Sequence, residues 1–204
     1  MAQINWGEDI QNFFNNDLAK MVGNLFKFPT TCLSKFADAC KVKSVVMPLM
    51  ALVVGYIVTT LMFLIMGVDF GSAAKSGLLL VFFVVVLCIL TFAALAAKGK
   101  SDINMALDHT AIHSFIFTIS MVFLGLIVLI EGDGPYAILK LGTDFWGIVM
   151  LLVIVYGLSL GISCMRQLMS TVEGEGKESY AWWISPCVVV VALALGIYLA
   201  TKIL

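Results

Sequence analysis

Charged residues are scarce in this chain of 204 residues, since Asp, Glu, Lys and Arg make up only 12% of it where a typical soluble domain has about 25%. Neither sign is in excess, because 12 basic and 13 acidic residues give a formal net charge of −1. This balance excludes the basic surplus of a nucleic-acid-binding protein and the acidic surplus of a disordered chain. We therefore expect no nucleic-acid partner.

The sequence also lacks the short motifs that mark catalytic and cofactor sites. It contains no HExxH, no phosphate-binding loop and no dinucleotide fingerprint, and its GxSxG match, Gly157 to Gly161, lies inside an apolar stretch rather than at a strand-to-helix turn. Its cysteines form no CxxC pair that would suggest zinc. We expect neither catalysis nor a cofactor.

Apolar residues instead make up 61% of the sequence, against about 45–50% in soluble domains. A chain of this length cannot bury so much apolar surface in one core, so lipid must cover the rest. A spanning helix needs about 20 mainly apolar residues, and five stretches meet this requirement: residues 45–68, 74–97, 111–130, 144–165 and 181–201. The predicted fold is an all-α polytopic bundle of five transmembrane helices over residues 45–204, preceded by a cytoplasmic segment over residues 1–44.

Lysine and arginine are distributed unevenly around these spans. Nine of the 12 lie before the first span or in the loops after the second and fourth spans, and three lie on the opposite side. Basic residues are enriched on the cytoplasmic side of membrane proteins. The N-terminus is therefore expected in the cytoplasm and the C-terminus outside it.

The segment before the first span has the pattern of an amphipathic helix. Residues 8–27 place apolar side chains three and four positions apart, with Asn, Asp and Lys on the other face. Pro29 ends this helix, and residues 30–41 repeat the pattern. We expect two interfacial helices whose lysines meet anionic headgroups. Alternatively, the apolar face packs on the cytoplasmic ends of the spans, or it docks a soluble partner.

The predicted surface for lipid and protein partners combines this segment with the basic second loop. It consists of Lys20, Lys27, Lys35, Lys41, Lys43, Lys98 and Lys100.

The middles of the predicted spans contain no Asp, Glu, Lys or Arg, which argues against an ion-driven pump. Small polar residues are present instead at four-residue spacing, namely Thr110, Ser114 and Thr118 in the third span and Ser159 and Ser163 in the fourth. These rows could line a narrow polar path, but such rows more often join helices.

Small residues recur at four-residue spacing in the last two spans. The fourth span has Gly157 and Gly161, and the fifth has Ala192, Gly196 and Ala200. This pattern lets helix backbones approach closely. It serves either packing within the bundle or the formation of a homo-oligomer.

Asp108, His109 and His113 form a cluster with metal-binding residue types. Histidines four apart lie on one helix face, where Asp108 could add a ligand. The sequence offers no clear third and fourth ligand beyond them, so we favour interfacial residues at a helix start over a metal site.

Several features together resemble the Yip1 family of five-span membrane proteins. These are the lysine-bearing amphipathic segment, the tight hairpin of the first two spans, the basic loop KGKSDINMALDHTAIHSF from Lys98, and three further spans. The fourth span ends in a polar loop before the last helix. The Asp-Leu-Tyr-Gly-Pro motif of eukaryotic trafficking members is missing before the first span. The resemblance implies a divergent bacterial member: a non-enzymatic protein of the inner membrane with a cytoplasmic N-terminus.

Two functions remain open on these grounds, and an enzyme acting on lipids, which would need the Asp108, His109 and His113 cluster, is a distant third. The first is a membrane adaptor or organiser that binds lipids and other membrane or cytoplasmic proteins through its N-terminal segment and basic loop. The alternative is an oligomeric channel or passive facilitator for a small solute or ion, lined by the hydroxyl rows.

The orientation gives the first testable prediction. A topology reporter fused after Leu204 should be active only outside the cytoplasm, because five spans separate it from the lysine-rich N-terminal segment. A cytoplasmic signal after Leu204 would contradict the five-span count. A fusion truncated at Lys100 should report the cytoplasm and serves as the control.

Overall fold

The computed structural model describes residues 5–27, 45–100, 102–132, 141–173 and 179–203, which are helical apart from short turns. Within these ranges, five helices are long and apolar enough to cross a membrane. They are α4 (Val46–Ile65), α5 (Phe70–Ala96), α6 (Ile103–Glu131), α7 (Phe145–Glu173) and α8 (Ser179–Ile203). The predicted all-α polytopic bundle is thus confirmed, and the chain is a multi-pass membrane protein.

Two helices extend well beyond the apolar stretches that predict them. Helix α6 begins at Ile103 because the Asp102 side chain accepts hydrogen bonds from the backbone N–H groups of Asn104 and Met105, at 2.9 and 3.4 Å. Helix α7 likewise continues to Glu173, past the end of its apolar run. Hydropathy detects the lipid-facing part of a helix, whereas capping decides where the helix starts.

Asp69 caps α5 in the same way, accepting a hydrogen bond of 3.0 Å from the backbone N–H of Ser72. Hydrogen bonds from the side chain and the backbone of Ser72 lower the pKa of the Asp69 carboxyl. The cap therefore retains its charge beside the positive end of the helix dipole.

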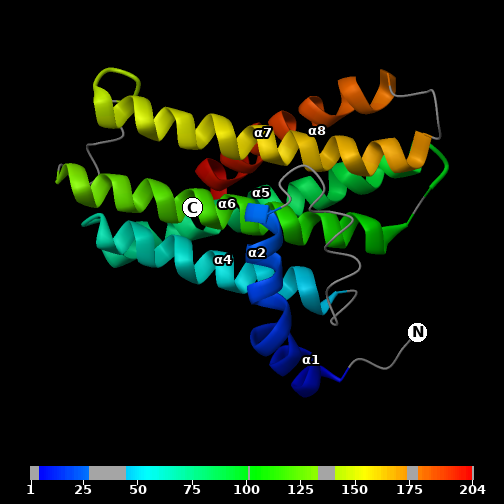
Figure 1. The fold of residues 1–204 in the computed structure, drawn as a ribbon, viewed down its shortest axis with the longest axis horizontal. Coiled ribbons are helices and arrows are strands. Elements are labelled where there is room, and N and C mark those ends of the chain that lie inside the picture. Colours follow the sequence, from blue (N-terminus) through cyan, green and yellow to red (C-terminus); the bar gives the residue numbers. More distant parts are fainter. Residues whose placement is uncertain (1–4, 28–44, 101, 133–140, 174–178, 204) are drawn as a thin grey trace.

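The long helices lie side by side along a common direction, and α6 runs through the centre of the bundle (Figure 1). It packs against α4, α5 and α7, while α8 packs against α5 and α7. Half of the apolar window of α6 is buried, compared with 22% for α7. Helix α6 is thus the central element and α7 the most peripheral of the five.

The N-terminal helix crosses these spans at a steep angle (Figure 1). It consists of α1 (Trp6–Asn12), a π-helical turn η1 (Phe13–Asp17) and α2 (Leu18–Lys27). Phe13, Met21 and Leu25 are buried in a cluster with the first half of α6, and the ring centroids of Phe13 and Phe115 lie 6.4 Å apart. Of the three alternatives for this apolar face, packing on the spans is the one that the structure shows, but the expected place was wrong: Leu25 and Phe26 lie against the middle of α6 and α7, not against the ends of the spans.

The second helix expected at residues 30–41 lies outside the described residues.

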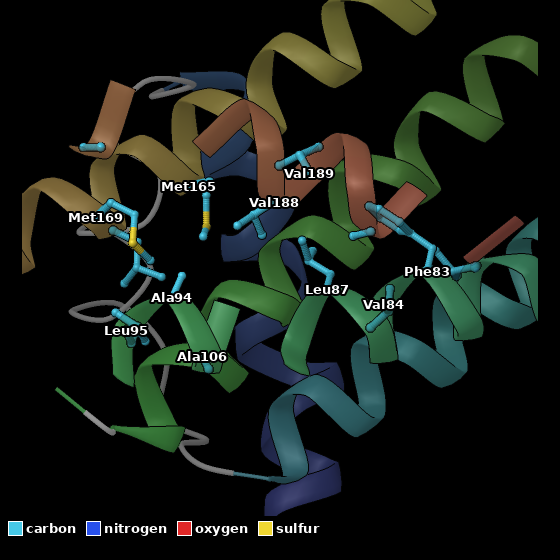
Figure 2. Packing of buried hydrophobic residues seen from close by; sticks show 14 residues of the cluster. Phe83, Val84, Leu87, Ala94, Leu95, Ala106, Met165, Met169, Val188 and Val189 are labelled. Atoms are coloured by element: carbon cyan, nitrogen blue, oxygen red, sulfur yellow. The ribbon is translucent and has the colours of Figure 1, made fainter. Parts of the chain in front are cut away.

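The largest apolar cluster joins α5 to α6, α7 and α8. Figure 2 shows its side chains, which include Phe83, Leu87, Leu95, Met165 and Val189. Helix α8 can approach α5 closely because Gly196 has no side chain: a Cβ atom added there would lie 2.9 Å from Cα of Phe83. That neighbour is backbone and cannot move aside on its own.

Replacing Gly196 by Ala should therefore destabilise the bundle by roughly 1–3 kcal/mol, the usual penalty for overpacking. The free energy of unfolding in mixed detergent micelles would measure this. Gly23→Ala in α2 is the matched control, because a Cβ atom added to Gly23 meets nothing within 4 Å. Equal stability of the two variants would contradict close packing at Gly196.

Candidate functional site

Basic and aromatic side chains gather at the end of the bundle where α5 and α7 end and α8 begins. The ammonium of Lys98 lies 4.0 Å from the ring centroid of Tyr180. The guanidinium of Arg166 lies 3.6 Å from the ring of Trp182. The Tyr180 hydroxyl also donates a hydrogen bond of 3.4 Å to the carbonyl of Ala94. We call Lys98, Lys100, Arg166, Tyr180 and Trp182 the basic end.

The chemistry of the basic end suits an anionic surface. A cation over an aromatic face is stabilised by about 0.5–1 kcal/mol at an exposed site, and it keeps its positive charge there. Trp182 is 56% exposed, and aromatic rings of this kind favour the headgroup level of a bilayer. Each surface lysine adds about 1 kcal/mol of attraction to anionic lipids.

The lysines of the predicted partner surface do not lie together in the structure. Lys98 and Lys100 belong to the basic end, whereas Lys20 and Lys27 are exposed on α2, which crosses the spans. Lys35, Lys41 and Lys43 lie outside the described residues.

Sequence analysis did not assign Arg166 or Trp182 to a site. In the sequence they are a cation and an aromatic residue near the ends of two successive spans. Only the packing of α7 on α8 brings the two side chains together.

The two hydroxyl rows face different directions. Thr110, Ser114 and Thr118 are buried, and Ser114 donates a hydrogen bond of 3.2 Å to the Ala51 carbonyl of α4. Ser159, by contrast, is exposed on the outer side of α7 and donates to the Val155 carbonyl at 2.7 Å. Ser163 is half-buried. A polar path that uses both rows is therefore not assembled within the chain.

The small residues lie where helices meet. A Cβ atom added to Gly157 would lie 2.6 Å from the Ser120 hydroxyl of α6, and one added to Gly161 would lie 3.1 Å from Nε2 of His113. On α8, Ala192 is fully buried and Gly196 meets α5. Ala200 lies near the end of α8.

The two histidines are buried side by side in α6, with ring centroids 4.2 Å apart. His113 joins α6 to α7, since its Nε2 atom lies 3.0 Å from the Gly161 carbonyl oxygen. His109 is fully buried, and neither of its ring nitrogens has a hydrogen-bond partner within the described ranges. Asp108 is half-buried one position away, yet no group of three His, Cys, Asp or Glu side chains in the described residues could hold a metal ion.

A small apolar cavity adjoins His113 between α6, α7 and α8. Its volume is about 180 Å³, and Phe83, Ser120, Gly157 and Val189 are among the residues that line it. An apolar cavity of about 150 Å³ is just large enough for benzene. The space next to His113 therefore suits at most a small apolar molecule.

No family model, no curated protein and no solved structure matches this chain. Its function is therefore argued from the residues above.

The histidine pair generates a stability prediction. His109→Leu removes two buried nitrogens that bond to no group, so it should leave stability unchanged or raise it by up to about 1–3 kcal/mol. His113→Leu loses the contact with the Gly161 carbonyl and should lower stability by about 0.5–1.5 kcal/mol. Thermal unfolding in detergent, followed by tryptophan fluorescence, compares the two. A larger loss for His109→Leu would show that His109 has a partner essential to the fold.

Proposed function

We propose that the protein is a non-catalytic membrane organiser that gathers anionic lipids, and proteins associated with them, at its basic end. The observation that supports this most directly is the pairing of Lys98 with Tyr180 and of Arg166 with Trp182 on neighbouring helix ends. Aromatic rings at the headgroup level and cations beside them provide the two components of an anionic-lipid surface.

The proposal includes an orientation and a membrane. The lysine distribution favours a cytoplasmic location for the basic end and for the N-terminal helix. Together with the resemblance to the Yip1 family, it supports a divergent bacterial member in the inner membrane. The exposed Lys20 and Lys27 lie apart from the basic end, on the N-terminal helix that crosses the spans.

Transport is less well supported. In the described part of the five spans, Asp, Glu, Lys and Arg lie toward the helix ends and none lies near the middle, where a coupled transporter would bind its ions. The facilitator alternative needs both hydroxyl rows in one path, yet the row on α6 faces α4 and Ser159 faces outward. These directions favour an organiser over a facilitator.

Lipid selectivity tests the proposal. The double variant Lys98→Ala, Lys100→Ala should lose about 2 kcal/mol of preference for anionic lipid, or roughly thirtyfold in relative affinity. Quenching of tryptophan fluorescence by brominated phosphatidylglycerol, compared with brominated phosphatidylcholine, measures this preference. A Trp6→Phe, Trp146→Phe background leaves Trp182 and Trp183 as reporters.

Lys75→Ala is the matched control, because Lys75 is an exposed lysine near the start of α5, at the opposite end of the bundle. Equal lipid preference in all variants would contradict the proposal. The same vesicles should show no solute or ion flux above protein-free vesicles, and a flux that Ser159→Leu abolishes would favour the facilitator instead.

A further inference from the structure

Helix α7 presents a large unpartnered face. It packs against α6 and α8, and its apolar window is the least buried of the five, at 22% against 28–50% for the others. Ile148, Leu152 and Val155 are 48, 61 and 50% exposed, and Ser159 is exposed on the same side.

The spacing of these four residues is that of a helix–helix seam. Ile148, Leu152, Val155 and Ser159 follow one another at intervals of four, three and four residues. These intervals average about 3.7 residues, close to one helical turn, so the row stays on one face of α7 and can face a parallel partner helix over several turns. The outer face of α4 differs, since its exposed residues Leu49, Val53, Ile57 and Leu61 recur every four residues and include no polar group.

Tyr156 lies at the edge of this seam in an environment that disfavours its hydroxyl. It is 60% exposed and stands ten residues from both Trp146 and Arg166, so each bilayer surface is about 15 Å away. A tyrosine side chain cannot reach either surface from that depth. Among the described residues no hydrogen bond joins this hydroxyl to another group. An unpaired hydroxyl in hydrocarbon is unfavourable.

Ser159 supplies the complementary group. Its hydroxyl hydrogen is donated to the Val155 carbonyl at 2.7 Å, which leaves the lone pairs of the serine oxygen available. Within the described part of the chain, Tyr156 therefore carries an unused donor and Ser159 an unused acceptor, three residues apart on the same side of one helix. A face that carries both is self-complementary about a two-fold axis.

We propose that the outer face of α7 is a homodimer interface, formed with α7 of a second, parallel copy of the chain. Ile148, Leu152 and Val155 pack along the seam, and the hydroxyl of each Tyr156 donates a hydrogen bond to Ser159 of the other copy. A groove of about 520 Å³ beside the seam, lined by Leu152, Tyr156 and Phe26 of α2 among others, leaves room for side chains of the second copy.

A second copy fits this face better than a lipid chain. An acyl chain in the middle of the bilayer offers no acceptor for the Tyr156 hydroxyl, whereas a second α7 offers one at the matching depth. Because the contact is isologous, each dimer contains it twice, and removing one hydroxyl type removes both bonds.

The experiment measures dimerisation of the full chain in liposomes by single-molecule photobleaching over a range of protein-to-lipid ratios. Tyr156→Phe and Ser159→Ala should each weaken the dimer by about tenfold in dissociation constant, since each removes two hydrogen bonds between the two copies. The double variant should be no weaker than either single variant, because both substitutions remove the same bonds. Tyr198→Phe on α8 is the matched control, as a tyrosine of similar exposure, 56%.

Disulfide formation locates the contact. In a background whose five native cysteines, including the exposed Cys187, are replaced by Ala, Val155→Cys should form a dimer cross-link, and Val190→Cys, at a similarly exposed position on α8, should not. A monomer at every ratio would overturn the proposal and leave lipid as the occupant of this face. A dimer that is insensitive to Tyr156→Phe and Ser159→Ala, or that cross-links through Val190→Cys alone, would overturn it as well.

Discussion

The high free energy of a charge in hydrocarbon is the constraint on which the rest of this structure depends. Among the described residues of the spans, acidic and basic side chains lie toward the helix ends, as Lys75, Arg166 and Lys202 illustrate. The helices are consequently joined through apolar packing and close backbone approach, as at Gly196 against Phe83. At one of these ends, Lys98, Lys100 and Arg166 lie together and form the basic end.

The same constraint governs the uncharged polar groups. A hydroxyl in a membrane helix can bond a carbonyl of its own helix, as Thr118 does with Ser114 at 2.7 Å, or a carbonyl of its neighbour, as Ser114 does with Ala51. Groups that find no such partner stand out. His109 is one of these in the core and Tyr156 is another on the surface. His109 affects the stability of the fold, and Tyr156 is the residue from which we infer a homodimer.

Much of the fold could be predicted because its determinants are local. Apolar runs of 20 residues predict spans wherever they occur, and they located all five helices. The true start of α6 was missed because it depends on the Asp102 cap rather than on hydropathy. The directions of the hydroxyl rows could not be predicted, since a four-residue spacing fixes a face of a helix but does not indicate which neighbour that face meets. Arg166 and Trp182 meet only after α7 packs on α8, so a single sequence shows two span-end residues and no site.

The central claim is that the basic end binds anionic headgroups. A cryo-electron microscopy map of the full chain in nanodiscs containing phosphatidylglycerol, with a rigid fiducial bound, tests it most directly. We predict ordered headgroup density beside Lys98, Lys100 and Arg166. Headgroup density confined to the opposite end of the bundle, or a basic end covered by protein and closed to lipid, would contradict this account.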